Sequence, residues 1–158
     1  PIHINSGGEE VIFTDVTFGA DEFFTSPSTT FTAASIPEIT NTEMDALYHT
    51  ERFTNSAAGF GYDIAVPNGS YTVILHFAEI FWGTSDGNPA GGVGSRIFNV
   101  TIEGGAVLED FDIFAEVGAQ AAVTKEFTIT ITDGVMNIEL IASVDTPKIS
   151  AIQIMETP

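Results

Sequence analysis

Apolar and polar residues alternate most clearly in the second half of the chain. Tyr71, Val73, Leu75 and Phe77 occupy every second position of residues 71–78, and polar or mixed side chains lie between them. A repeat of two residues is typical of a strand with one buried face. The pattern therefore predicts a strand whose odd-numbered side chains face the core.

Further strands follow, separated by turn residues. Apolar residues alternate with Thr and Glu over residues 123–132, Asp133 and Gly134 then favour a hairpin turn, and residues 135–142 return. We also expect extended segments at residues 2–5, 11–13, 61–66, 96–103 and 148–156, and a Gly-rich loop at residues 83–95.

The first third of the chain has a weaker pattern. Residues 19–45 carry Ser, Thr, Pro and acidic residues without clear periodicity, which predicts a long, ordered surface loop with one or two short turns. A helical turn is expected at residues 44–50, and no helix of normal length is expected after it.

Many short strands joined by Gly and Asp turns predict an all-β fold, namely an antiparallel β-sandwich of the jelly-roll type. The length of 158 residues suits one domain with one core, and no repeat or linker is visible. We interpret residues 1–158 as a single β-sandwich domain. Because both Pro1 and Pro158 look like fragment edges, we expect the domain to be part of a larger protein with other domains in the same chain.

The charge balance excludes several partners. Asp and Glu outnumber Lys and Arg by 22 to 4, a formal net charge of −18, so nucleic acids and anionic membrane surfaces would be repelled. The absence of cysteine excludes disulfides, thiol catalysis and thiolate zinc sites. No apolar run approaches the ~20 residues of a membrane-spanning helix, so membrane insertion is not expected.

The acidity has two interpretations, a solvated surface or discrete Ca²⁺ sites. Asp110, Asp112 and Glu116 are spaced like oxygen ligands, but apolar residues interleave with them as core residues would. A Ca²⁺ role stays open, no cofactor is required, and no metal ligand is assigned. Three histidines lie far apart and are better explained as packed or surface residues than as metal ligands, namely His3, His49 and His76.

Several segments, in this order along the chain, resemble the malectin family. The first are Ile4-Asn5-Ser6-Gly7-Gly8, Leu47-Tyr48-His49-Thr50-Glu51-Arg52-Phe53, Phe60-Gly61-Tyr62-Asp63-Ile64 and Val66-Pro67-Asn68-Gly69-Ser70-Tyr71-Thr72-Val73. They are followed by Leu75-His76-Phe77-Ala78-Glu79-Ile80-Phe81-Trp82, Gly94-Ser95-Arg96-Ile97-Phe98-Asn99-Val100, Asp110-Phe111-Asp112-Ile113-Phe114 and Pro147-Lys148-Ile149-Ser150-Ala151-Ile152. The resemblance covers nearly the whole chain, and its specificity lies in the ordered combination.

The resemblance implies a β-sandwich that binds short glucose-containing saccharides without cleaving them. In the family, loop aromatics and an acid near the final strand hold the ligand, and these positions carry over as Phe53, Phe81, Trp82 and Asp145. A further family tyrosine falls within the stretch that corresponds to residues 19–45 and is not assigned to a residue. Animal members have Tyr where this chain has Phe53 and Phe81, so the ring faces are retained without their hydroxyl groups.

The aromatic pair Phe81-Trp82 also has a physical reading. It follows the alternating strand and precedes the Gly-rich loop, and adjacent side chains of a strand point to opposite faces. The pair therefore either presents a ring to a sugar or caps the end of the core. We expect Arg52 to pair with a carboxylate, for which Glu79 is the candidate; a direct role of Glu79 in sugar binding is the lesser alternative.

The main functional hypothesis is a non-catalytic carbohydrate-binding module on an extracellular or cell-surface protein. The alternative is a calcium-stabilised ligand-binding or spacer domain of a bacterial surface adhesin that contacts protein or peptide. A glycoside hydrolase would need two carboxylates ~5 to 10 Å apart. Among 22 acidic residues such a pair arises by chance, so we do not expect an enzyme.

Overall fold

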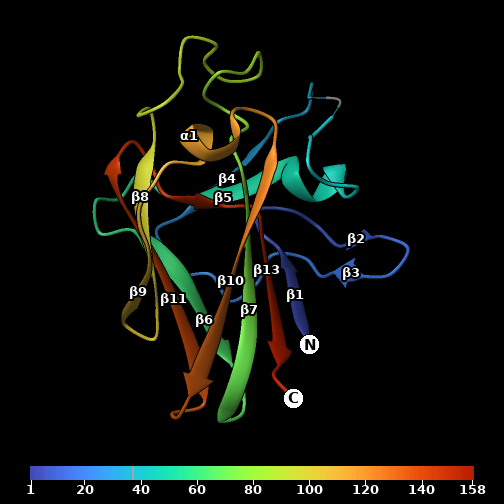
Figure 1. Cartoon of the computed structure of the whole chain (residues 1–158), viewed down its shortest axis with the longest axis vertical. Coiled ribbons are helices and arrows are strands. Elements are labelled where there is room, and N and C mark those ends of the chain that lie inside the picture. Colours follow the sequence, from blue (N-terminus) through green and yellow to red (C-terminus); the bar gives the residue numbers. More distant parts are fainter. Residues whose placement is uncertain (37) are drawn as a thin grey trace.

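Two four-stranded antiparallel sheets lie face to face and form the β-sandwich (Figure 1). The computed structural model describes residues 1–36 and 38–158. The first sheet has the order β1 (Ile2–Asn5), β13 (Ala151–Glu156), β7 (Gly69–Ala78) and β10 (Ala122–Ile131). The second has the order β6 (Phe60–Ala65), β11 (Val135–Val144), β8 (Ile97–Ile102) and β9 (Gly105–Phe111). The predicted antiparallel sandwich is therefore confirmed.

The main core lies between these sheets. The four apolar residues predicted for one face of β7 are all buried, namely Tyr71, Val73, Leu75 and Phe77. The ring of Phe77 lies 5.8 Å from that of Phe98 and 5.0 Å from that of Phe111. These three rings come from different strands, so one aromatic cluster joins the two sheets.

A smaller sheet crosses one end of the sandwich and lies in the upper half of Figure 1, below the loops at the top. It has the order β12 (Lys148–Ile149), β5 (Thr50–Phe53) and β4 (Thr29–Thr32), and a 3-10 helix, η1 (Asp45–Tyr48), precedes β5. A hairpin of β2 (Val11–Ile12) and β3 (Thr17–Phe18) extends to the side. A second apolar cluster lies beneath these elements and includes Phe18, Leu47, Tyr48 and Ile80.

Three expectations need correction. Residues 19–45 are not only a loop, because they contain β4 and because Phe24 bridges to Tyr62 at the free edge of β6. The segment has a single apolar residue per short strand, so no repeat reveals it. Strands β3, β5 and β9 and the short helix α1 (Ile113–Val117) were also not expected. The expected final strand is interrupted at Ser150, so that β12 and β13 belong to different sheets.

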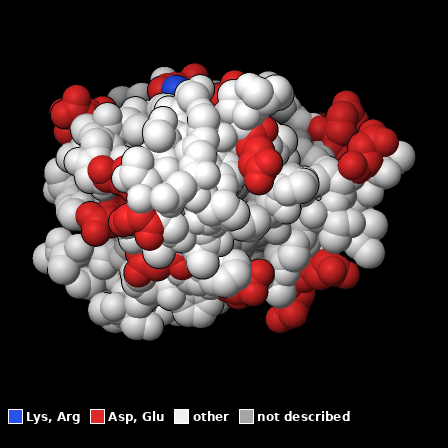
Figure 2. All heavy atoms as spheres, turned by 90° about the horizontal axis from the view of Figure 1, so that it is seen from below, with Lys and Arg blue, Asp and Glu red and all other residues white. Residues whose placement is uncertain are grey.

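All four basic side chains are paired with carboxylates. The salt bridges are Arg52–Asp21, Arg96–Glu79, Lys125–Glu116 and Lys148–Glu51. Acidic side chains are spread over the face shown in Figure 2, where basic ones are scarce. The surface therefore offers an anionic partner little positive charge. In the described ranges 1–36 and 38–158, no helix is both long and apolar enough to cross a membrane.

Candidate functional site

A pocket of about 150 Å³ opens where the small sheet meets the loops at the end of the sandwich. Its walls come from β4, β5, the residues that follow β7, the residue before β8 and the turn between β11 and β12. The lining residues are Phe31, Glu51, Phe53, Asn55, Phe81, Arg96, Asp145 and Thr146. Segments far apart in sequence thus supply aromatic rings and carboxylates to one small volume.

The pairing of β4 with β5 explains how two of the rings reach the pocket. Phe31 lies opposite Glu51 in this ladder, and Phe53 lies two residues further along β5. Side chains two residues apart on a strand share a face, as do directly opposed residues of paired strands. Phe31, Glu51 and Phe53 therefore point to the same side of the small sheet, and Arg52 points to the other.

The third ring belongs to Phe81, just beyond the end of β7. Its centroid lies 5.9 Å from that of Phe31, and the two rings meet edge to face. The ring of Trp82 lies 5.0 Å from that of Phe81, again edge to face. Such aromatic pairs add roughly 0.5–1.5 kcal/mol beyond the burial of their area. Mutual contact between these aromatic side chains thus stiffens the wall of the pocket.

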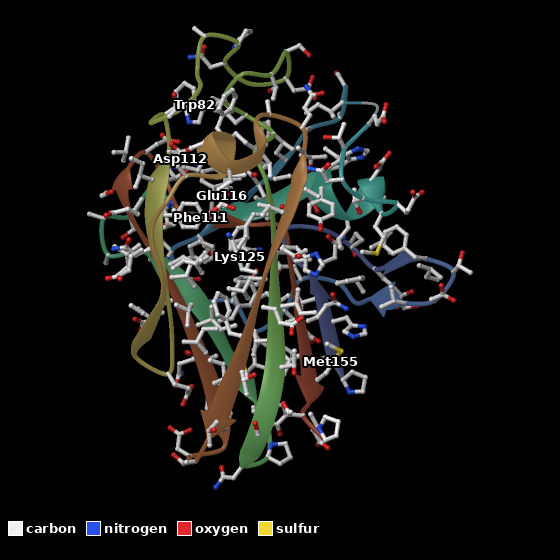
Figure 3. All side chains as sticks on the ribbon, viewed as in Figure 1. Trp82, Phe111, Asp112, Glu116, Lys125 and Met155 are labelled. Carbon is white, nitrogen blue, oxygen red and sulfur yellow. The ribbon has the colours of Figure 1, made fainter. Side chains whose placement is uncertain are left out.

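Trp82 does not line the pocket but lies beside it, at the base of the loop of residues 83–95 (Figure 3). The indole ring lies directly against Gly91, where an added Cβ would come within 2.3 Å of a ring carbon. Its Nε1–H donates a hydrogen bond to Asp145 Oδ2 over 3.0 Å. The predicted ligand residue Trp82 is therefore placed to orient the predicted acid Asp145.

Asp145 has an unusual backbone conformation, and only one of its two carboxylate oxygens, Oδ2, accepts a hydrogen bond from another described residue. Its φ is +60°, a left-handed value that Asp tolerates better than most residues. Oδ2 accepts from Trp82 and lies 3.1 Å from Arg96 Nη1. Oδ1 has no hydrogen-bond partner within residues 1–36 and 38–158, and 32% of the side chain is exposed. One carboxylate oxygen is thus free to accept a hydrogen bond from a ligand.

Glu79 lies beneath the aromatic wall of the pocket, which is formed by Phe31, Phe53 and Phe81, and it binds the backbone amides of Phe81 and Trp82. Its Oε2 accepts from the amide N–H groups of Phe81 and Trp82, each at 3.2 Å. Its Oε1 accepts from Arg96 Nε at 2.8 Å, and Lys148 Nζ lies 3.4 Å from Oε2. Glu79 is 1% exposed, so these contacts replace the water that a buried carboxylate would otherwise need.

The two cations control how this buried network ionises. Burial alone would raise the pKa of Glu79, but the charges of Lys148 and Arg96 and the Arg96 hydrogen bond lower it to about 2. Burial raises the pKa of Glu51 against the attraction of Lys148, with which Glu51 forms an ion pair. Burial would lower the pKa of Arg96, yet Glu79 and Glu51 raise it above its usual value.

The structure brings together three of the four residues carried over from the resemblance, because Phe53, Phe81 and Asp145 line one pocket. It adds Phe31, the only aromatic residue of the described ranges 19–36 and 38–45 that lines the pocket. Its short Thr-Thr-Phe-Thr stretch is the signal that would have suggested a strand there. The sequence also did not identify Glu51, Asn55, Arg96 or Thr146 as lining residues.

The expected partner of Arg52 was wrong. Arg52 Nε pairs with Asp21 Oδ2 at 2.5 Å, because Arg52 faces away from Glu79 on the other side of the small sheet. Glu79 is instead engaged by Arg96 and Lys148. Its burial beneath the wall argues against direct contact with a ligand.

Two of the three carboxylates considered as Ca²⁺ ligands, those of Asp112 and Glu116, are engaged by other groups of the protein. Asp112 accepts hydrogen bonds from the amides of Ala115 and Gly94, and Glu116 forms a salt bridge with Lys125. Within the part of the chain that the structure describes, no three His, Cys, Asp or Glu side chains group as a metal site would require. Of the histidines, His76 is packed, with Nδ1 2.7 Å from Tyr48 Oη and Nε2 2.8 Å from Gln153 Oε1.

Comparisons with known proteins agree with this architecture. The family model "Malectin domain" matches residues 1–152. Malectin-B of Xenopus laevis is 32% identical over 111 residues, which cover 70% of this chain and 37% of that protein. A probable receptor-like serine/threonine-protein kinase of Arabidopsis thaliana with leucine-rich repeats is 34% identical over 129 residues, which cover 81% of this chain and 12% of the kinase.

Solved structures share the fold at low sequence identity. A β-glucuronidase of Bacteroides uniformis superimposes with a TM-score of 0.81 at 21% identity, covering 99% of this chain and 18% of that enzyme. The ANXUR1 extracellular domain of Arabidopsis thaliana gives a TM-score of 0.83 at 15% identity, covering 99% of this chain and 48% of that one. The fold thus occurs as one part of larger chains, and the present chain spans well under half of Malectin-B. The match over residues 1–152 shows that the chain belongs to the malectin domain family, whose members are carbohydrate-binding domains without catalytic activity of their own.

Proposed function

We propose that the pocket bounded by Phe31, Phe53, Phe81 and Asp145 binds a short saccharide of the glucose type. One observation carries this proposal: segments separated by more than 100 residues converge to place three phenyl rings beside a carboxylate with a free oxygen. A pyranose ring has an apolar C–H face and a rim of hydroxyl donors. Aromatic rings suit the first, and the Asp145 carboxylate suits the second.

The size of the pocket limits how much of the ligand it encloses. Its volume of about 150 Å³ lies below the ~300 Å³ at which pockets for drug-sized ligands begin. We therefore expect one sugar ring to enter, while the remainder of the saccharide lies across the loops. Because the three rings carry no hydroxyl group, Asp145, Asn55 and Thr146 supply most of the polar contacts.

The domain holds its ligand without cleaving it. The buried pair Glu51 and Glu79 is engaged by Lys148 and Arg96, and neither carboxylate is positioned as a free acid and base at the pocket surface. We further propose that the domain serves a larger extracellular or cell-surface chain as its glycan-recognition part, in keeping with the domain's small share of the related chains.

Calorimetric titration with glucose, maltose and cellobiose tests the proposal. We expect saturable binding by the wild-type chain and at least about 10-fold weaker binding by Phe81→Ala, since truncating a central aromatic anchor commonly costs about 2 kcal/mol. Phe23→Ala is the matched control, because Phe23 is 44% exposed and lies outside this pocket. Thermal unfolding of each variant verifies that it is folded. Equal affinity in the wild type and Phe81→Ala, or no binding of any sugar, would overturn the proposal.

A further inference from the structure

The charged groups around the pocket are arranged so that negative charge is more accessible to a ligand than positive charge. The side chains of Arg96 and Lys148 are 4% and 0% exposed, whereas that of Asp145 is 32% exposed. Arg96 donates through Nε and Nη2 to Glu79 and through Nη1 to Thr146. The cations thus serve the protein's own carboxylates, and Asp145 Oδ1 is the charged atom that a ligand meets.

The balance of formal charge points the same way. Three carboxylates, Glu51, Glu79 and Asp145, surround the two cations of this network. If Glu51 is ionised the network carries one net negative charge, and if Glu51 is protonated the network is neutral. Neither state gives the network a net positive charge, and the chain as a whole carries a formal charge of −18. A ligand that carries a carboxylate would therefore be repelled.

The aromatic wall favours a cation as well. Phe31, Phe53 and Phe81 supply π-systems without any hydroxyl donor. An ammonium group within about 6 Å of an aromatic ring face is attracted by the π-electrons of the ring, and more strongly when it is shielded from water. Three rings beside a free carboxylate oxygen, in a pocket of about 150 Å³, match a small cationic group better than a neutral hydroxyl group.

We propose that the pocket selects saccharides that carry a protonated amine, such as glucosamine units, and discriminates against saccharides that carry a carboxylate. This inference rests on the proposed saccharide site and names the class of sugar that fills it. The amine donates to Asp145 Oδ1 and contacts the phenyl rings, whereas a uronate would place its charge against Asp145 with no free cation to receive it.

Four disaccharides with the same β-1,4 linkage separate charge from shape: chitobiose with free amines, its di-N-acetyl form, cellobiose, and cellobiouronic acid. We expect chitobiose to bind at least about 10-fold more tightly than cellobiose at pH 6 and low salt, and the uronic acid at least about 10-fold more weakly. Di-N-acetylchitobiose, which lacks the charge, should lose the advantage of chitobiose. Added salt should reduce the differences in Kd between these disaccharides, because it screens exposed charges.

Asp145→Asn tests the origin of the preference, since Asn also tolerates a positive φ and retains an acceptor oxygen. We expect the ratio of the Kd values for cellobiose and chitobiose to fall toward one in this variant, whatever its absolute affinity. Glu126→Gln, which removes an exposed charge on β10, should preserve the ratio. If cellobiose binds but the uronic acid binds as well or better, or chitobiose shows no advantage, this inference fails and the saccharide site stands. If none of the sugars binds, both fail.

Discussion

The centre of the sandwich and its pocket end are built from the same strands by opposite means. Between the sheets, β7 contributes only apolar side chains such as Val73, Leu75 and Phe77. Two residues after Phe77 along the chain, Glu79 lies between Arg96 and Lys148, and its side chain is also almost completely buried. The centre is stabilised by burial of apolar area, whereas the pocket end depends on pairing of charges that water cannot reach.

This difference has a consequence for how each region fails. Loss of an apolar side chain leaves a cavity whose cost scales with its size. Loss of one charge in the network leaves its partners buried and uncompensated, so the cost depends on residues that were not changed. The pocket end should therefore show strong coupling between substitutions, and the centre should respond to each one mainly through the volume removed.

Phe77→Ala should give the largest effect. Phe77 is 0% exposed and contacts the rings of Phe98 and Phe111, so its truncation should destabilise the fold by about 4 kcal/mol. Urea unfolding measures the change, with Phe23→Ala as a solvent-exposed comparison expected to cost less than about 1 kcal/mol. A loss below about 1 kcal/mol for Phe77→Ala would show that the aromatic cluster does not carry the core.

Glu79→Gln should destabilise the fold by about 3 kcal/mol, because it leaves the buried charges of Arg96 and Lys148 with one fewer counter-charge. A double-mutant cycle with Lys148→Met, in which urea unfolding gives the free energy of each variant, measures the coupling between the two residues. If the network acts as a unit, Lys148→Met should cost less in the Glu79→Gln background than in the wild type. Strictly additive costs would contradict the coupling.

Acidification should destabilise the fold of the wild type, because Glu79 becomes protonated. The pKa of Glu79 falls from its usual value of 4.5 to about 2 on folding, so its stabilisation is fully present above pH 4.5 and is lost as the pH approaches 2. The shift corresponds to an order of 3 kcal/mol at most. Unfolding curves between pH 5 and pH 2 should therefore be less pH-dependent for Glu79→Gln than for the wild type. Parallel curves would mean that Glu79 is not the group that titrates.

The smallest effect is expected at the exposed ion pair of Lys125 and Glu116. Their side chains are 27% and 42% exposed, so water and salt screen the attraction. Lys125→Ala should change the free energy of unfolding by less than about 1 kcal/mol, as measured with urea at 0.15 M salt. A change as large as that of Glu79→Gln would remove the distinction between buried and surface pairs on which the comparison depends.

The two regions also differ in how well the sequence predicts them. Alternation over residues 71–78 and 123–132 identifies β7 and β10, because a half-buried strand imposes a period of two. Strand β9 was not predicted, because buried and exposed residues do not alternate along it. Strand β4 was not predicted, because it carries only one apolar residue, Phe31, whose burial depends on contact with Phe81.

The charged network could not be predicted from local pattern. Arg96 lies 17 residues from Glu79, and Lys148 lies 69 residues from it. Nothing in either local segment specifies the partner, and the predicted pairing of Arg52 with Glu79 was therefore wrong. The positions of Phe53, Phe81 and Asp145 came from the resemblance to the family, and the structure supplied the reason that they belong together, which is the crossing of the small sheet over the end of the sandwich.

The most direct test of the saccharide site uses the only tryptophan of the chain. The indole N–H of Trp82 donates to Asp145 at the edge of the pocket, so its single ¹H–¹⁵N signal reports on that carboxylate. Titration with cellobiose and chitobiose should shift this signal saturably, with the same Kd as calorimetry. Saturable heat without movement of the indole signal would place the sugar elsewhere on the molecule and contradict the account.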